Sequence, residues 1–465
     1  MAGLQNEGNL RVADVLPVFF VLVAGAIFGG SMVVLTPPFN VPEEQQHLFR
    51  SYQCSQGIVY ATRSGNAVGG EVPESFHEVN SRIIGGPRDE YSLRISLNTI
   101  KSCLAVPLDP ERHVFATFPV TVRYSPVSYL PSAAALGIGR CLGLKALKEV
   151  YLGRTGTLIG YLLLVAAAVW LMPVHKWTLA LVALMPMSIF LAASLSADAI
   201  SSGISLLAIA LILRLALGPA PISRRSLGWL GLVMLLLALA KPGYVLLSLF
   251  FFLVPKERFS DRRHCWQVRA WLVGLPLAVS IAWVLSIRGL CVPLRPNIDV
   301  NAQAHWMLAN PGTYLQSLAA RLFDPDLYFA TIALLGWGTI LLPMDLYRVY
   351  WFALLVTAVL DGGREKVRVP LSTRAGGVGV YLLVMSVITT LTYLTWHAVG
   401  ESFINGVQPR YLIPVLPLLL LPLRSRAEVA SSRLSRWLVP CMAIAVVMLG
   451  IGGTWKAMIV RHYWP

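Results

Sequence analysis

The sequence has 465 residues, of which 56% are apolar and only 13% are charged. Soluble proteins carry about 25% charged residues, and here the apolar residues occur in long runs separated by short charged segments. This composition excludes a soluble globular enzyme, a disordered protein and a secreted disulfide-rich scaffold. It indicates a protein that crosses a membrane several times.

The net charge of +15 comes from 38 basic and 23 acidic residues. The basic excess lies in short segments between apolar runs, where Lys and Arg keep a loop on the cytoplasmic side, so we expect no nucleic-acid partner. The N-terminal segment Met1–Val12 is polar, and the first apolar run continues past signal-peptide length without a small-residue cleavage site. We therefore expect this run to remain in the protein as a helix.

The apolar runs predict an all-α polytopic bundle of about eleven membrane-spanning helices, since a crossing helix needs about 20 residues, or about 17 at the short end. The expected spans are Ala13–Leu35, Thr155–Met172, Trp177–Leu195, Ala199–Leu217, Leu227–Ala240, Tyr244–Val254, Ala270–Ile287, Asp345–Asp361, Gly376–Trp396, Tyr411–Leu423 and Trp437–Met458. Two short runs are separated by Lys241-Pro242-Gly243. Because a broken helix at membrane depth usually borders a cavity, we expect a cavity there.

The loops predict the orientation and the domain organisation. With this number of spans, the basic loops all lie on one side, which the positive-inside rule makes cytoplasmic, with the N-terminus inside. Their basic residues are Lys176, Arg214, Arg224, Arg225, Lys256, Arg258, Arg262, Arg263, Arg364, Lys366, Arg368, Arg374, Arg424, Arg426, Arg433 and Arg436. The chain then divides into residues 1–35 (tail and first span), 36–154 (a long outer loop), 155–287 (the second to seventh spans), 288–344 (a second outer loop) and 345–465 (the last four spans).

Two further apolar stretches, Ser125–Leu144 and Leu327–Leu342, are expected to form interfacial or re-entrant helices on the outer side. The alternative makes both of them spans and raises the number to about thirteen. That alternative would place the basic residues between Arg140 and Arg154 inside, but it would put the Arg214–Arg225 loop outside, against the rule. Transporters often have two related halves, and no second loop here matches the long first one, which argues mildly against a transporter.

The 6 cysteines form no CxxC or zinc-binding pattern. Cys54 and Cys103 share the long outer loop, where oxidising conditions would let them pair. Two unpaired cysteines are the alternative.

The segment with the clearest chemistry is Thr36–Gly57, which reads TPPFNVPEEQQHLFRSYQCSQG and follows the first span directly. Its prolines keep the chain extended, and the last of them suits the first position of a helix. Glu43 and Glu44 then stand in the first turn, where the helix dipole favours carboxylates. Glu43, His47 and Arg50 are spaced i, i+4, i+7 and share one face. We expect a carboxylate, an imidazole and a guanidinium to face one direction at the membrane surface; ordinary helix capping and surface charge are the alternative.

These residues resemble the signature of a large prokaryotic membrane-protein family catalogued as domain of unknown function 2142, in which Pro-Pro-Phe precedes a proline, an acidic pair, a histidine, an arginine and an aromatic residue. That family resembles the GT-C glycosyltransferases, which include oligosaccharyltransferases, protein O-mannosyltransferases and lipid A aminoarabinose transferases. The resemblance implies a GT-C-like bundle whose catalytic carboxylate follows the first span. Here that residue is Glu43. The family usually has Asp-Glu, so Glu43 is one methylene longer, and either Glu43 or Glu44 could be the base.

Three later stretches also resemble this family. Pro186–Asp198 resembles a segment at the outer end of the third span, where GT-C enzymes often have a second acidic residue. This implies a catalytic role for Asp198, and helix capping accounts for the residue equally well. Ala240–Tyr244 resembles a Lys-Pro-x-Tyr element, which implies substrate binding by Lys241 and Tyr244. A lysine inside an apolar run is costly, and it is by default a functional candidate.

Gly406–Pro417 resembles a Gln-Gly-Arg-Tyr element, with Pro409 in place of the glycine. The predicted substrate-binding residues are His47, Arg50, Lys241, Tyr244, His305, Gln408, Arg410 and Tyr411. Among them, His305 comes from the second outer loop, where polar and aromatic side chains together suit a carbohydrate or an ordinary interfacial loop.

The resemblance implies transfer of a sugar from a polyprenyl-phosphate or -diphosphate donor to a hydroxyl of a cell-envelope glycan or glycolipid, with inversion of the anomeric carbon. A hydroxyl needs a base, for which one carboxylate suffices. The leaving lipid phosphate needs fixed cations at low dielectric, and Lys241 and Arg410 suit that role. No Gly-rich phosphate loop stands out, which disfavours a soluble nucleotide-sugar donor. The sequence also has no HExxH motif and no GxSxG serine site.

The active site is expected on the outer face of a prokaryotic plasma membrane. The expected partners are the donor lipid, the glycan or glycolipid acceptor and the membrane lipids. A divalent metal such as Mg²⁺ or Mn²⁺ is possible at Glu43, Glu44 and Asp198. A transporter or flippase of a lipid-linked glycan is the alternative function, in which Glu43 and Lys241 would bind cargo without chemistry. A polymerase or ligase that uses prenyl-linked glycans is a third hypothesis.

Overall fold

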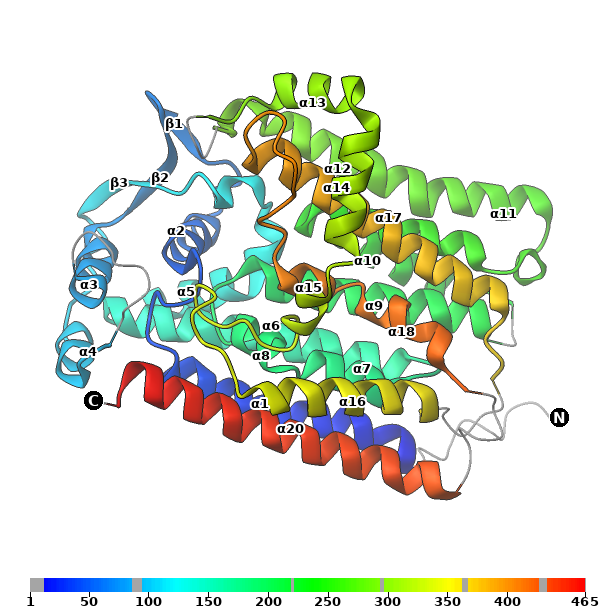
Figure 1. The fold of residues 1–465 in the computed structure, drawn as a ribbon. Coiled ribbons are helices and arrows are strands. Elements are labelled where there is room, and N and C mark those ends of the chain that lie inside the picture. Colours follow the sequence, from blue (N-terminus) through cyan, green and yellow to red (C-terminus); the bar gives the residue numbers. More distant parts are fainter. Residues whose placement is uncertain are drawn as a thin grey trace.

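The computed structural model describes residues 12–85, 94–218, 221–292, 297–361, 367–425 and 433–464. The polar N-terminal tail before Val12 and the loop residues Arg364, Lys366 and Arg426 lie outside these ranges. The described chain is mostly helical, and its long helices run side by side (Figure 1).

Within the described ranges, 6 helical segments are long and apolar enough to cross a membrane. They lie in α1 (Val12–Leu35), α6 (Ala146–Leu171), α9 (Ala197–Leu217), the joined helices α11 (Arg262–Arg269) and α12 (Leu275–Ser286), α17 (Leu371–Trp396) and α20 (Arg433–His462). Each overlaps a predicted span. The prediction of a multi-pass helical membrane protein is therefore confirmed.

The other predicted spans are short or broken. α10 (Arg224–Ala240) and α16 (Met344–Leu360) have 17 residues each, at the short end of the crossing range. The run after Lys241 is a 3₁₀ helix, η3 (Pro242–Leu253). The run expected over Tyr411–Leu423 is divided into η7 (Pro409–Leu412), α18 (Leu416–Leu420) and η8 (Leu421–Leu423). Helix length alone therefore supports fewer crossings than the sequence predicts.

The predicted single span Trp177–Leu195 is two helices, α7 (Lys176–Ala183) and α8 (Pro186–Ala192). Pro186 has no N–H to donate, and the residue before it has φ −53° and ψ 143°, outside the helical region. Nearly every residue of both helices is buried. Protein therefore surrounds this break, as it must where backbone groups lose their helical partners away from water.

The stretch Ser125–Leu144 forms η2 (Pro126–Tyr129) and α5 (Leu130–Cys141), which packs on α6. With 12 residues, α5 is about 18 Å long, well short of a hydrocarbon layer of about 30 Å. By its length, α5 alone is too short to cross a membrane, and its interfacial or re-entrant position stays a prediction.

The predicted helix over Leu327–Leu342 is wrong beyond its first residues, because α15 covers only Pro325–Phe329. Gly336 and Gly338 follow with φ of 60° and 82°, a left-handed conformation that a helix does not contain. The apolar residues of this irregular segment are inside the protein: Ile332, Ala333 and Leu335 are each 0% exposed. The apolar run therefore reflects burial in the fold and not helix formation.

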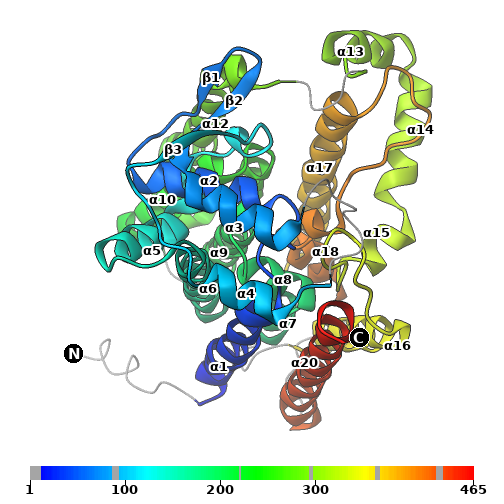
Figure 2. The same ribbon diagram turned by 90° about the vertical axis from the view of Figure 1, so that its left-hand side faces the viewer.

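The long loop between α1 and α6 has its own small fold, which the sequence analysis did not predict. It contains α2 (Glu44–Ser55), α3 (Glu74–Ile84), α4 (Leu97–Cys103) and an antiparallel sheet of β1 (Thr62–Ser64), β2 (Ala67–Pro73) and β3 (His113–Thr117), in that order. Gly65, with φ 58°, supplies the tight turn between β1 and β2. The sheet with α2 and α3 lies apart from α13 and α14, on the other side of the view in Figure 2.

The stretch Arg288–Asp326, predicted as a loop, is mostly helical, with α13 (Val300–Ala309) and α14 (Pro311–Leu322). Asp299 caps α13, since its carboxylate accepts hydrogen bonds from Asn301 N and Ala302 N at 3.0 and 2.9 Å. These two helices contain many polar residues, so a search for apolar runs does not predict them.

Candidate functional site

Glu43 precedes α2 in a left-handed backbone conformation, with φ 61° and ψ 14°. Phe39, in the turn before it, has φ 66°. Such conformations are uncommon outside glycine, cost about 1–3 kcal/mol each, and gather at functional sites where surrounding structure holds them. The Glu43 side chain makes no capping hydrogen bond to α2. Helix capping therefore does not explain this carboxylate.

The Asp198 carboxylate lies between two cations. Its Oδ1 accepts a hydrogen bond from Lys241 Nζ at 2.6 Å, and its Oδ2 is 2.8 Å from Arg410 Nε. The exposed fractions of the Asp198, Lys241 and Arg410 side chains are 9%, 14% and 13%. The cap of α9 is Ser196, whose hydroxyl accepts a hydrogen bond from Asp198 N. We call Asp198, Lys241 and Arg410 the Asp198 cluster.

Three breaks in regular structure present these side chains. Asp198 stands in the first turn of α9, directly after the turn that ends α8. Lys241 ends α10 in an extended conformation, with φ −154° and ψ 106°, as the following proline demands. Arg410 lies in the first turn of η7. The cluster therefore forms where three segments far apart in the sequence leave helical geometry.

Tyrosine rings enclose the Lys241 ammonium. Its Nζ is 4.0 Å from the centroid of the Tyr411 ring, 5.5 Å from that of Tyr244 and 6.0 Å from that of Tyr124. A cation over an aromatic face is attracted by about 0.5–2 kcal/mol. Tyr244 also donates its hydroxyl to the carbonyl of Tyr411, at 2.9 Å. These contacts fix the Lys241 side chain in one place, so Tyr244 and Tyr411 belong to the site.

Glu43 shares the electrostatic environment of the Asp198 cluster. Burial, the largest influence, raises the pKa of Glu43 above its ordinary value of 4.5. The charge of Asp198 raises this pKa further, whereas Arg410, Arg123 and Lys241 lower it. A carboxylate whose pKa is raised holds a proton more tightly and is better suited to act as a general base near neutral pH.

His47 lies on α2 beside the same groups and stays uncharged. Burial lowers the pKa of His47 from 6.5 to about 3, although the charge of Asp198 opposes this effect. Its Nδ1 forms a hydrogen bond with the hydroxyl of Tyr129 at 2.8 Å. A neutral imidazole can orient a hydroxyl group, but it adds no charge to the site.

Sequence reasoning missed Arg123, Tyr124 and Tyr129. The Tyr124 ring lies 6.0 Å from the His47 ring and 6.3 Å from the Tyr129 ring, and Arg123 acts on the pKa of Glu43. One signal was available: Arg123-Tyr124 repeats the Arg-Tyr pair of residues 410 and 411. Both pairs supply a cation and an aromatic ring to the same place.

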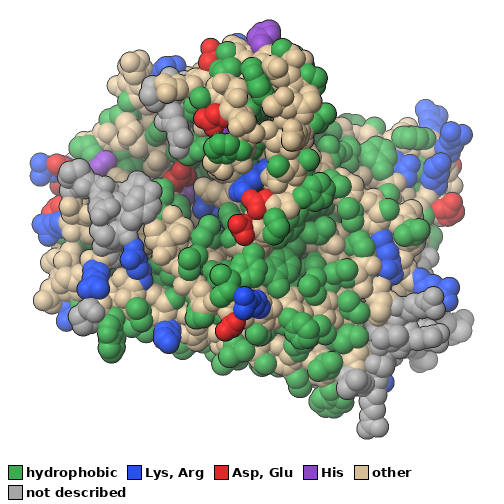
Figure 3. Space-filling model, in the orientation of Figure 1, with side chains coloured by type: hydrophobic (Ala, Val, Ile, Leu, Met, Phe, Trp, Pro, Cys, Tyr) green, Lys and Arg blue, Asp and Glu red, His purple; other side chains and the backbone are tan. Residues whose placement is uncertain are grey.

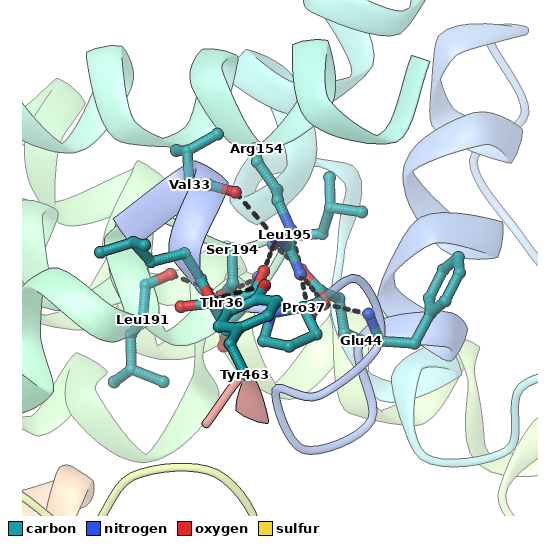
Figure 4. Close-up of polar contacts among 12 residues, drawn as sticks. Val33, Thr36, Pro37, Glu44, Arg154, Leu191, Ser194, Leu195 and Tyr463 are labelled. Carbon is teal, nitrogen blue, oxygen red and sulfur yellow. Dashed lines mark hydrogen bonds and ion pairs between the residues drawn. The ribbon is translucent and has the colours of Figure 1, made fainter. Parts of the chain in front are cut away.

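Glu44, the neighbour of Glu43, faces a different environment (Figure 4). Its carboxylate pairs with Arg154, with 2.5 Å between Oε2 and Nη2, and both side chains are 0% exposed. Glu44 therefore meets no substrate from solvent or membrane. Of the two carboxylates that the motif offers, only Glu43 lies near the Asp198 cluster.

Three other predicted binding residues lie elsewhere or make internal contacts. Arg50 is buried and donates to the carbonyl of Val59 at 2.5 Å, so it holds the chain that follows α2. His305 is exposed on α13. Gln408 precedes η7, and its backbone carbonyl accepts from Tyr411 N at 2.9 Å.

Among the described residues, no group of three or more His, Cys, Asp or Glu side chains gathers as metal ligands do. The possible metal site of Glu43, Glu44 and Asp198 does not form, because Arg154 occupies Glu44 and two cations occupy Asp198. Cys54 and Cys103 are both unpaired, which agrees with the second of the two alternatives for these residues.

The site brings cations and carboxylates together in a region of low solvent exposure. Three cations, Lys241, Arg410 and Arg123, accompany two carboxylates, so a net positive charge remains for an anionic ligand. In the space-filling view, acidic, basic and histidine side chains meet in a recess between the region of α2 and that of α14 and α15 (Figure 3). Such a site can hold a phosphate and take a proton from a hydroxyl.

A family model described as "Predicted membrane protein (DUF2142)" matches residues 26–419 of this chain. This range contains Glu43, the Asp198 cluster and the tyrosines around it. No curated protein and no solved structure matches the chain.

Proposed function

The chain belongs to the DUF2142 family of predicted membrane proteins, and from this premise we propose that it is a membrane glycosyltransferase of the GT-C type. It transfers a sugar from a polyprenyl-phosphate or -diphosphate donor to a hydroxyl of a cell-envelope glycan or glycolipid. The observation that supports this proposal best is the position of Glu43. A carboxylate with a raised pKa lies beside two nearly buried cations, both of which pair with Asp198.

In the proposed reaction, Glu43 accepts the proton of the acceptor hydroxyl. The acceptor oxygen attacks the anomeric carbon from the face opposite the phosphate, and the bond between that carbon and the phosphate oxygen breaks. Its electron pair stays on the lipid phosphate, so the products are an inverted glycoside and the lipid phosphate. No redox step or additional reactant is needed.

Lys241 and Arg410 stabilise the charge that grows on the leaving phosphate. Fixed cations in a site poor in water stabilise such charge much more strongly than mobile cations in solution. Asp198 holds both in place before the donor binds, at 2.6 and 2.8 Å. Arg410 can present two N–H groups to phosphate oxygens, whereas Lys241 acts as a point charge.

The proposal includes a membrane topology. About eleven crossings, with the basic loops inside, would put the loop between α1 and α6 and the Asp198 cluster on the outer face of a prokaryotic plasma membrane. Lipid-linked sugars would reach the site from that leaflet. The family's resemblance to GT-C enzymes supports this arrangement.

The test uses purified protein in detergent and a panel of radiolabelled polyprenyl-phosphate sugars. Glu43→Gln should bind the donor as wild type does and lose transfer by about 100-fold or more. Glu71→Gln is the matched control, because Glu71 is an exposed carboxylate of β2 in the same loop. If no donor supports transfer by wild type, or if Glu43→Gln transfers normally, the proposal is wrong. Flipping of a lipid-linked glycan without transfer would favour a transporter instead.

A further inference from the structure

We propose that Arg154, through Glu44, is a positioning residue that sets Glu43 at its working place relative to the Asp198 cluster. This inference rests on the proposed function, because it assigns Glu43 a catalytic task. Arg154 lies in α6 and does not touch the cluster itself.

Arg154 and Glu44 form a two-pronged pair inside the protein. Arg154 Nε donates to Glu44 Oε1 at 2.7 Å, and Nη2 donates to Oε2 at 2.5 Å. Both side chains are 0% exposed. A planar guanidinium that meets a carboxylate through two parallel bonds fixes direction as well as distance.

The other N–H groups of Arg154 hold the end of α1. Nη1 donates to the carbonyls of Val33 and Thr36 at 3.0 and 2.7 Å, and Nη2 donates to that of Pro37 at 3.0 Å. The last carbonyls of a helix have no partner within it. Arg154 therefore satisfies one of these carbonyls, that of Val33, and the carbonyls of the two residues after the helix. With its two bonds to Glu44, it uses all of its five donors.

Glu44 also accepts hydrogen bonds from the backbone, and Figure 4 shows its carboxylate at the centre of this network with Arg154 and Leu195. Its Oε2 accepts from Phe39 N at 2.9 Å, and its Oε1 accepts from Leu195 N at 3.3 Å. Phe39 is the left-handed residue of the turn before Glu43. Leu195 belongs to the turn that leads into Asp198. One ion pair thus ties the segment that carries Glu43 to the segment that carries Asp198.

This network explains how a strained Glu43 is held. Its left-handed backbone persists only if neighbouring structure compensates for the cost. Besides the hydrogen bond that its own carbonyl accepts from His47 N at 3.0 Å, the nearest constraint is Glu44, the next residue, whose carboxylate is fixed by four N–H groups. A shift of about 1 Å at a reacting group can reduce a rate by about 100-fold. Loss of the pair should therefore reduce the rate of transfer more than the binding of the donor.

The experiment compares Arg154→Lys and Glu44→Gln with wild type in the full-length protein. Glu44→Gln is nearly isosteric and leaves the hydrogen bonds from Arg154 to the end of α1. If Arg154→Lys fails to fold, Glu44→Gln alone still tests the inference. Arg269→Met is the matched control. Arg269 is also a buried arginine, and its Nη2 donates to the carbonyls of Phe252 and Val254 at the end of η3. Thermal stability, kcat, KM for the donor and the pH–rate profile are measured for each.

We expect kcat to fall by about 10–100-fold in both variants, with KM changed by less than about 3-fold. The acidic limb of the profile should move, because the surroundings of Glu43 change. Arg269→Met should lose stability and keep kcat and the profile. If Glu44→Gln is less stable but keeps wild-type kcat and the same acidic limb, the pair is only structural and the inference is wrong. That result differs from failure of the proposed function, in which wild type itself transfers no sugar.

Discussion

Asp198 Oδ1 accepts a hydrogen bond from Lys241 Nζ at 2.6 Å, across 43 positions of sequence. The same carboxylate is 2.8 Å from Arg410 Nε. The cations are therefore placed before any ligand arrives, and one carboxylate organises both.

Asp198→Asn should reduce both activity and stability. The variant leaves two nearly buried cations without their counter-charge, and removal of one partner from a buried pair typically costs about 3–5 kcal/mol. We expect a loss of kcat/KM of about 100-fold and a lower melting temperature in detergent. Asp345→Asn is the control, because the Asp345–Arg348 pair is 88% and 69% exposed and such pairs contribute at most about 1 kcal/mol. Equal behaviour of the two variants would contradict the role of Asp198.

The transfer rate should decline on the acidic side at a higher pH than an ordinary glutamate would give. The base works only when ionised, and burial raises the pKa of Glu43 above 4.5. A plot of kcat/KM against pH measures this limb in the free enzyme. An acidic limb at or below pH 4.5, the ordinary value, would show that another group is the base.

Glu43→Gln should also stabilise the fold at neutral pH. The folded state binds the Glu43 proton more tightly than the unfolded chain does, because the pKa of Glu43 is raised in the folded state. The contribution of Glu43 to stability is therefore lost as the pH rises from 4.5 through the raised pKa. Glutamine does not ionise, so the variant lacks this loss of stability. Melting temperatures of both proteins, measured at acidic and neutral pH, should converge at low pH. A variant that is less stable at neutral pH than wild type would count against this assignment.

His47 should make the protein sensitive to acid. The pKa of His47 falls from 6.5 to about 3 on folding, so the unfolded chain binds this proton more tightly. Stability from this group is complete above pH 6.5 and is lost as pH falls toward 3, by at most about 1.4 kcal/mol per pH unit. His47→Gln should lack this part of the pH dependence of thermal unfolding. An unchanged slope in the variant would refute the buried, neutral imidazole.

Cysteine labelling should show the orientation. Ser64 in β1 and Ser260 between η4 (Lys256–Arg258) and α11 are both exposed. In a variant without native cysteines, Ser64→Cys should react with an impermeant maleimide in intact cells. Ser260→Cys should react only after permeabilisation. The opposite pattern would place the Asp198 cluster at the cytoplasmic face.

Much of the site can be predicted because its parts follow recognisable breaks in apolar runs. Glu43 follows the first span, Lys241 interrupts an apolar run, and Arg410 starts one, so each is a polar residue at the edge of an apolar run. Arg123 and Tyr124 come from a polar loop, and their only sequence signal is that they repeat the Arg-Tyr pair of residues 410 and 411. The structure brings them to the site because η1 (Thr121–Arg123) packs on α2 and the following η2 packs on α2, α9 and α10.

Other features depend on contacts that no local pattern contains. Glu44 and Arg154 are 110 positions apart, so the sequence could not show which of the two neighbouring glutamates is already paired. An apolar composition likewise does not separate a membrane helix from the buried irregular segment after Phe329. Burial in protein and burial in lipid select the same side chains.

Because η3 is a 3₁₀ helix, it is longer than an α-helix with the same number of residues would be. A 3₁₀ helix rises about 2.0 Å per residue, compared with about 1.5 Å in an α-helix, so the 12 residues of η3 extend about 24 Å, where an α-helix would extend about 18 Å. Longer 3₁₀ stretches are uncommon because their hydrogen bonds are poorer. Relaxation of η3 to an α-helix would shorten it by about 6 Å and pull Lys241 toward the opposite end of the segment. The position of the Lys241 ammonium beside Asp198 thus depends on the 3₁₀ conformation of η3, which follows Lys241 directly.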